Sequence, residues 1–182
     1  MNQRQAIRVL RALDDAGRYV FRRQHLRTCF HEDSEKTFAA GLARLVDTGI
    51  LTRAARAVYV HDAAKSRDGY TIERIAIALR PAELSYISLE SALAEYGVIS
   101  QIPIDRITLM TTGREGEIRT PYGTIEFVHT KRDPADLRQA TLSSDHPLRM
   151  AKIDTAIRDL RRVGRNLHLI DPEALQEALA KP

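Results

Sequence analysis

The stretch Asp33-Ser34-Glu35-Lys36-Thr37-Phe38, which continues to Gly49, carries the clearest structural signal in the first third of the chain. Asp33 and Ser34 are residue types that cap helix N-termini, and glycine is a common helix stop, so the residues between are predicted to be helical. At 100° per residue, the apolar side chains of this helix fall on one stripe, which predicts a buried face: Phe38, Leu42, Leu45 and Val46.

The opposite face of the same helix is small, polar and basic. It is predicted to carry Lys36, Thr37, Ala40 and Arg44. A helix with such a face can enter the DNA major groove, which is about 12 Å wide. The alternative interpretation is an ordinary packing helix whose polar face is solvated.

A hairpin is predicted directly after the helix. Residues 50–52 and 57–60 have strand composition, and the link between them, residues 53–56, contains Arg53 and Arg56. Upstream, the pattern predicts a helix over residues 3–15, a short strand over residues 19–21 and a second helix over residues 22–30. This order, with a short turn before the third helix, is typical of a winged helix-turn-helix.

The candidate DNA contacts lie in three places. Phosphate contacts are expected from the hairpin link and from the start of the second helix, and base contacts from the third helix. The residues are Arg22, Arg23, Ser34, Lys36, Thr37, Ala40, Arg44, Arg53 and Arg56.

Charge distribution supports the same segment. Residues 1–60 contain 11 Lys and Arg against 6 Asp and Glu, whereas the remainder of the chain is nearly neutral. One cysteine, Cys29, excludes a disulfide framework, and we expect it to be a small buried residue. The sequence shows no apolar run long enough to span a membrane and no signal-peptide pattern at its N-terminus, so a cytoplasmic protein without a membrane partner is expected.

The whole chain is predicted to have an α+β fold with two domains, residues 1–62 and 69–182, joined by a polar loop or linker. In the second domain we expect helices over residues 70–79 and 84–96. An antiparallel three-stranded meander follows over residues 104–111, 117–120 and 124–130. Residues 131–147 read as a loop, and C-terminal helices are expected over residues 148–163 and 172–179.

Two stretches resemble the AbiEi family of antitoxins from abortive-infection, type IV toxin-antitoxin systems. One combines Gly41-Leu42-Ala43-Arg44-Leu45-Val46 with Gly49-Ile50-Leu51-Thr52-Arg53 and Val58-Tyr59-Val60. The sharper one is Tyr86-Ile87-Ser88-Leu89-Glu90-Ser91-Ala92-Leu93-Ala94-Glu95-Tyr96-Gly97. The resemblance covers roughly residues 5–130. It implies an N-terminal winged helix-turn-helix that represses its own operon at inverted repeats, and a C-terminal antitoxin domain that counters a nucleotidyltransferase toxin. Larger family members have a longer second domain than this chain.

No enzymatic constellation, metal site or cofactor site is predicted. The glycines around residues 113–123 fit neither a dinucleotide fingerprint nor a phosphate-binding loop, and the histidines lack ligand spacing. Asp105 and Glu126 could face each other across strands like a nuclease pair. However, position 128 is Val128 where a nuclease motif would place lysine.

Two other functions remain open. In the first, the second domain is a protein-interaction module that binds an acidic partner, such as the toxin itself, and DNA binding is secondary. The contacts would be Arg158, Arg161, Arg162 and Arg165, and the alternative for that helix is a solvated face. The second is RNA binding by the first domain, which the scarcity of aromatic residues disfavours.

Overall fold

The computed structural model describes residues 2–100 and 105–180 and has the α+β composition expected from the sequence. Its contacts divide the chain into two compact units, residues 1–79 and 80–182. Each unit is described by itself.

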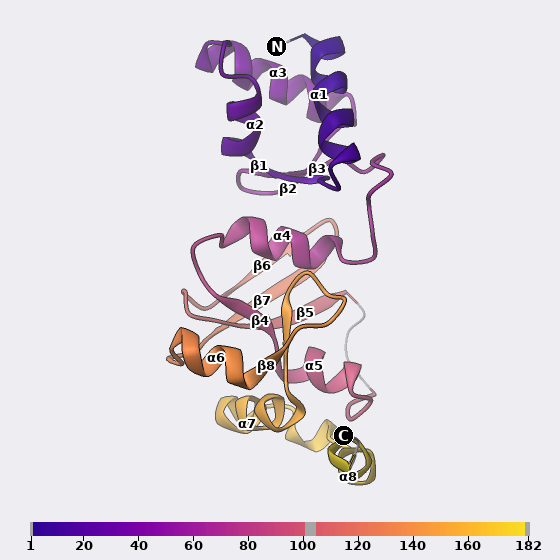
Figure 1. Ribbon diagram of the computed structural model, residues 1–182, viewed down its shortest axis with the longest axis vertical. Helices are drawn as coiled ribbons and strands as arrows, with labels where there is room; N and C mark the ends of the chain where they lie inside the picture. The colour runs from indigo at the N-terminus through magenta and orange to yellow at the C-terminus, as the bar shows by residue number, and fades with distance from the viewer. Residues whose placement is uncertain (1, 101–104, 181–182) are drawn as a thin grey trace. The chain divides into compact units, whose positions relative to one another are not determined.

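The first unit consists of four helices and one small sheet (Figure 1). The three strands are antiparallel and lie in the order β1-β3-β2, with Val20 opposite Val60 and Thr52 also opposite Val60. The first three helices lie on one face of this sheet, and the fourth packs against β1 and β3. The elements are α1 (Gln3–Asp15), β1 (Val20–Arg22), α2 (Arg23–Cys29), α3 (Glu35–Asp47), β2 (Thr52–Ala55), β3 (Val58–Val60) and α4 (Thr71–Leu79).

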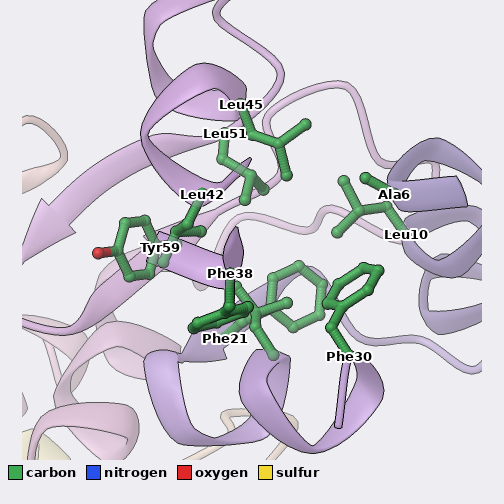
Figure 2. Close-up of a cluster of buried hydrophobic side chains, with 10 residues drawn as sticks. Ala6, Leu10, Phe21, Phe30, Phe38, Leu42, Leu45, Leu51 and Tyr59 are labelled. Carbon is green, nitrogen blue, oxygen red and sulfur yellow. The ribbon is translucent and has the colours of Figure 1, made fainter. Parts of the chain in front are cut away.

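Apolar side chains from the first three helices and the sheet meet in one core (Figure 2). Phe38 is fully buried, and its ring lies 6.4 Å from the ring of Phe30. Leu42 and Leu45 join them from successive turns of α3. Burying a side chain of this size stabilises a fold by roughly 1.5–3 kcal/mol, so the predicted stripe fixes which face of α3 is left outside. Cys29 is exposed, because the buried stripe of α2 runs through Leu26 instead, and its expected burial was wrong.

The loop after β3 belongs to the first unit and is not a free linker. The Asp14 carboxylate accepts the backbone N–H groups of Lys65 and Ser66 at 2.9 and 2.8 Å. The buried Tyr19 hydroxyl donates to Asp68 at 2.6 Å, and Asp68 also binds Arg74 of α4. These bonds hold α4 on the first sheet, so the unit ends after Leu79 and not within residues 63–68.

The second unit is built on a six-stranded mixed sheet in the order β6-β7-β5-β4-β9-β8. α5 packs on β5, and α7 packs on α5. The elements are β4 (Ser85–Ile87), α5 (Leu89–Glu95), β5 (Arg106–Thr111), β6 (Gly116–Thr120), β7 (Gly123–His129), α6 (Pro134–Ala140), β8 (Thr141–Leu142), β9 (Arg149–Ala151), α7 (Ile153–Val163), the 3-10 helix η1 (Leu167–Leu169) and α8 (Pro172–Ala180).

The expected meander was wrong. β5 and β7 are adjacent and parallel, with Leu109 opposite Phe127. Among the described strands, β6 pairs with β7 alone. β6 is a polar strand with exposed Glu117 and Arg119, which suits a sheet edge, whereas the buried Ile125 and Phe127 place β7 inside the sheet. Ile104, the expected first strand residue, lies outside the described residues.

Three further expectations about the second unit were also wrong. Residues 84–96 form a strand before the helix, because Tyr86 and Ile87 are buried by pairing with β5 and β9. Residues 131–147 contain α6 and β8, with Asp133 capping α6 through its side chain. Residues 149–151 form β9, so the next helix begins at Ile153.

A buried polar cluster joins β4, α5 and α7. Asp159 is 1% exposed and accepts hydrogen bonds from the Tyr86 hydroxyl at 3.0 Å and the Ser88 hydroxyl at 2.9 Å. Arg132 completes the cluster with an ion pair to Asp159 at 2.7 Å. Burial and the nearby Asp159 raise the pKa of Tyr86 to about 12, although Arg132 acts in the opposite direction. Tyr86 and Ser88 of the sharper resembling stretch therefore tie α7 to the sheet.

Within the described residues, every helix is too short or too polar to cross a membrane.

Candidate nucleic-acid interface

The face of α3 opposite the core is open to solvent. The Ser34 side chain caps the helix by accepting the Thr37 N–H at 3.2 Å, and Gly49 follows the helix with a φ of +70°. The predicted contact residues on this helix and its cap are all exposed: Ser34, Lys36, Thr37, Ala40 and Arg44. Ala39 and Ala43 are exposed as well, so three short side chains leave the helix backbone accessible.

Two arginines of α2 are held against the first turn of α3. Arg23 forms an ion pair with Glu35, and Arg27 approaches the same carboxylate at 3.4 Å. Their guanidinium groups also lie over the Phe38 ring, at 5.1 Å for Arg23 and 5.5 Å for Arg27. Arg23, a predicted phosphate contact, is therefore half-buried and already shares its charge with an acid.

Arg27 also fixes the turn between α2 and α3. Its guanidinium donates to the Phe30 carbonyl at 2.5 Å and to the Asp33 carbonyl at 2.8 Å. These bonds set the direction in which α3 leaves the turn. The roles of Arg27 and Glu35 were not predicted from the sequence. The four-residue spacing of Arg23 and Arg27 predicts that the two arginines share one face of a helix. It does not predict that they bind the carboxylate of Glu35, which lies beyond the turn.

The hairpin is shorter at its tip than expected. The strands extend to Ala55 and from Val58, so only Arg56 and Ala57 form the turn, and Ala57 has a φ of +60°. Arg53 was expected in the link but lies in β2, opposite Tyr59. A register shift between Arg53 and Ala55 accommodates this, because it buries the Ala54 side chain in the unit.

Arg53 and Arg56 are nevertheless exposed, and among the described residues neither forms an ion pair. The hairpin tip is joined to α2, because the Arg23 N–H donates to the Ala57 carbonyl at 2.8 Å. Arg22 is half-buried next to this bond. Through Arg23 and Glu35, the tip is thus connected to the N-terminal end of α3. These contacts place Arg23 and the hairpin tip next to the start of α3, whereas Arg44 lies more than two turns further along the helix.

A pocket of about 240 Å³ lies beside α3, between this helix and the start of α1. The residues that line it are Asn2, Gln3, Ala6, Gly41, Arg44, Leu45 and Thr48. Arg44 therefore stands at the border between the pocket and the exposed face.

The predicted partner-binding arginines lie on α7 and just after it, and three of the four contact other groups of the second unit. Arg158 pairs with Asp154 at 3.6 Å, and Arg162 donates to the His129 carbonyl at 2.9 Å. Arg161 is exposed and has no ion pair among the described residues. The carbonyl leaves the charge of Arg162 in place, so Arg161 and Arg162 remain exposed and without an ion pair among the described residues.

Arg165 belongs to an ion-pair cluster on the sheet. It donates to Glu90 at 2.9 Å and to Glu126 at 2.9 Å, and Arg106 binds the same Glu126 at 3.1 Å. The hydrogen bonds that Arg165 donates to Glu126 and Glu90 raise the pKa of its guanidinium despite its partial burial. Burial pushes the pKa of Glu90 upward, but the bonds from Arg165 and Asn166 outweigh it and lower the pKa.

The possible nuclease pair does not form. The strand register places Glu126 opposite Thr108, whereas Asp105 precedes β5 and its carbonyl accepts the Thr124 N–H. Within residues 2–100 and 105–180, no group of three His, Cys, Asp or Glu side chains is arranged to hold a metal ion.

The chain matches no family model and no curated protein in the comparisons made.

Proposed function

We propose that this protein is a sequence-specific DNA-binding repressor, and that its first unit is a winged helix-turn-helix. In this proposal α3 is the recognition helix, the β2–β3 hairpin is the wing, and Arg22 and Arg23 lie near the flanking backbone. The order α1-β1-α2-α3-β2-β3 and the sheet order β1-β3-β2 support this assignment.

The observation that carries the proposal is the exposed face of α3. Lys36 and Arg44 provide hydrogen-bond donors for base edges, and the exposed alanines allow the helix to approach closely. On the hairpin, Arg53 and Arg56 provide positive charge, and no acid in the described part of the chain pairs with them.

The test is a mobility-shift series, over a range of salt concentrations, with DNA from upstream of the protein's own gene and a random duplex as control. Arg44→Ala is expected to cost about 1–3 kcal/mol on the operator and to relax sequence preference. Arg53→Ala is expected to weaken binding to both duplexes alike. Equal losses on operator and random DNA for both variants would reject these roles.

Arg161→Ala is the matched control for both substitutions. It removes the same charge from an exposed position in the second unit. We expect it to leave the affinity for DNA unchanged. A loss as large as that of Arg53→Ala would mean that net charge, and not the proposed face, determines binding.

We further propose, from the resemblance to AbiEi antitoxins, that the protein represses its own operon and counters a nucleotidyltransferase toxin encoded beside it. The second unit would carry the antitoxin activity. The test is growth rescue when the full chain is expressed together with that toxin. A pull-down then distinguishes direct binding from indirect neutralisation, and failure of rescue would leave the chain a repressor without antitoxin activity.

A further inference from the structure

The exposed face of α3 also constrains the DNA sequence that it reads, provided that the proposed DNA-binding function is correct. We propose that each operator half-site presents two guanines, three to four base pairs apart, that are contacted by Lys36 and Arg44. A thymine between them would place its methyl group against Ala40.

The spacing follows from the helix geometry. Lys36, Ala40 and Arg44 lie four residues apart on α3, and all three are exposed. At 100° per residue they deviate from a straight line by only about 40° per step, so they form one row. The ends of the row are eight residues, or about 12 Å, apart along the axis. Base pairs rise by about 3.4 Å each, so the row spans three to four of them.

The choice of bases follows from the side chains. Lysine and arginine have only hydrogen-bond donors, and guanine is the base that offers two acceptors, N7 and O6, in the major groove. Ala40 offers a methyl group, which suits the methyl of thymine. The exposed Ala39 and Ala43 add no longer side chain that would hold the helix away from the groove.

An acidic residue lies beyond each end of the row formed by Lys36, Ala40 and Arg44. Asp47 lies on the same side of α3, about 20° from Lys36, and its exposed carboxylate would be repelled by phosphates if the C-terminal turn lay deep in the groove. At the other end, Glu35 is paired with Arg23 and Arg27. The readout is therefore confined to the segment between Lys36 and Arg44.

The experiment is selection of bound sequences from a randomised duplex library by the intact chain. The enriched half-site should contain two G·C pairs at the stated spacing. Lys36→Ala and Arg44→Ala should each relax a different one of these pairs and weaken binding to the selected site about 10- to 100-fold. Arg161→Ala is the control and should yield the same half-site as the unaltered protein.

The thymine contact has its own readout. Replacing that thymine by uracil removes only the methyl group, and binding should weaken about three- to fourfold. With Ala40→Gly the two duplexes should bind equally, because the protein side of the contact is gone. A uracil effect that persists in this variant would assign the methyl contact to another residue and overturn that part of the inference.

The outcomes separate this inference from the proposed function. An enriched site without paired guanines at that spacing, or with both substitutions relaxing the same position, overturns the inference and leaves DNA binding intact. If no sequence is enriched and all duplexes bind alike, sequence-specific repression itself fails.

Discussion

The arginines of the two units differ in what surrounds them. In the second unit, Arg106, Arg132 and Arg165 each lie within 3.1 Å of a carboxylate and connect separate elements. In the first unit, Arg53 and Arg56 are exposed, and within the described residues they have no ion pair. The net charge of the sequence counts all of these arginines equally. The charges of Arg53 and Arg56, however, are not offset by a paired carboxylate and can attract a polyanion. The position of nearby acids thus distinguishes the arginines of the proposed binding surface from those that connect elements of the second unit.

The largest effect is expected from breaking the buried cluster of the second unit. Asp159→Ala leaves Arg132 without its carboxylate and removes the acceptor of Tyr86 and Ser88. Removing one partner of a buried pair costs about 3–5 kcal/mol. Chemical denaturation of the full chain, with hydrogen exchange to assign the transition to the second unit, measures the loss.

Asp154→Ala is the matched control, because its pair with Arg158 is about two-thirds exposed on both sides. We expect a loss below about 1 kcal/mol. Neither variant should alter DNA binding by the first unit. An equal small loss in both variants would show that the buried cluster is not what holds α7 to the sheet.

The next effect concerns the salt dependence of DNA binding. Each phosphate contact contributes about 0.9 to the slope of the logarithm of affinity against the logarithm of salt concentration. Arg53→Ala and Arg56→Ala should therefore each reduce the slope by about 0.9, and the double variant by about 1.8. Arg165→Ala should leave the slope unchanged, because its charge is neutralised by Glu90 and Glu126. An unchanged slope in the double variant would remove the hairpin from the interface.

The sequence predicted the first unit better than the second, for a physical reason. In α3 the apolar stripe, the Ser34 cap and Gly49 are all local, so the helix bounds and the exposed residues followed directly. The pairing of β5 with β7 depends on which strand can best occupy a sheet edge. The order of the strands in the sequence suggested instead that β6 lies between β5 and β7. The partners of Arg165 are 39 and 75 residues away, so no local pattern could show that its charge is neutralised.

The first unit also contains an arginine that is paired like those of the second unit. Arg74 forms an ion pair with Asp68, so this pair can be compared with the exposed Arg53 and Arg56. Hydrogen bonds from Arg74 outweigh partial burial and lower the pKa of Asp68 from its ordinary 3.8 to about 2. A carboxylate whose pKa is depressed by folding stabilises the fold above its unfolded pKa, and this contribution disappears as the pH falls. Stability of the first unit should therefore decrease between about pH 4 and pH 2.

Solvent screening reduces this contribution to about 1 kcal/mol, because Asp68 is 32% exposed. The Tyr70 amide, which donates to Asp68 at 3.0 Å, reports the titration in NMR spectra. Its midpoint should lie near pH 2, and Asp68→Asn should remove it and lower the stability at neutral pH. A midpoint near 4 would mean that the bond to Arg74 does not persist in solution.

The smallest effect should come from Glu35, whose pairs with Arg23 and Arg27 make part of the proposed DNA-binding surface resemble the second unit. Its carboxylate is 64% exposed and shares the charges of Arg23 and Arg27. Glu35→Gln keeps the shape of the side chain but releases both arginines and removes a repulsion toward phosphate. Exposed ion pairs are worth about 0.2–1 kcal/mol, so affinity for random duplex DNA should rise about two- to fivefold at low salt.

Glu32→Gln changes an exposed acid in the preceding turn and controls for the change in net charge. A rise of equal size in both variants would show that Glu35 acts only through net charge, and weaker binding by Glu35→Gln would show that its bonds position the arginines for phosphate.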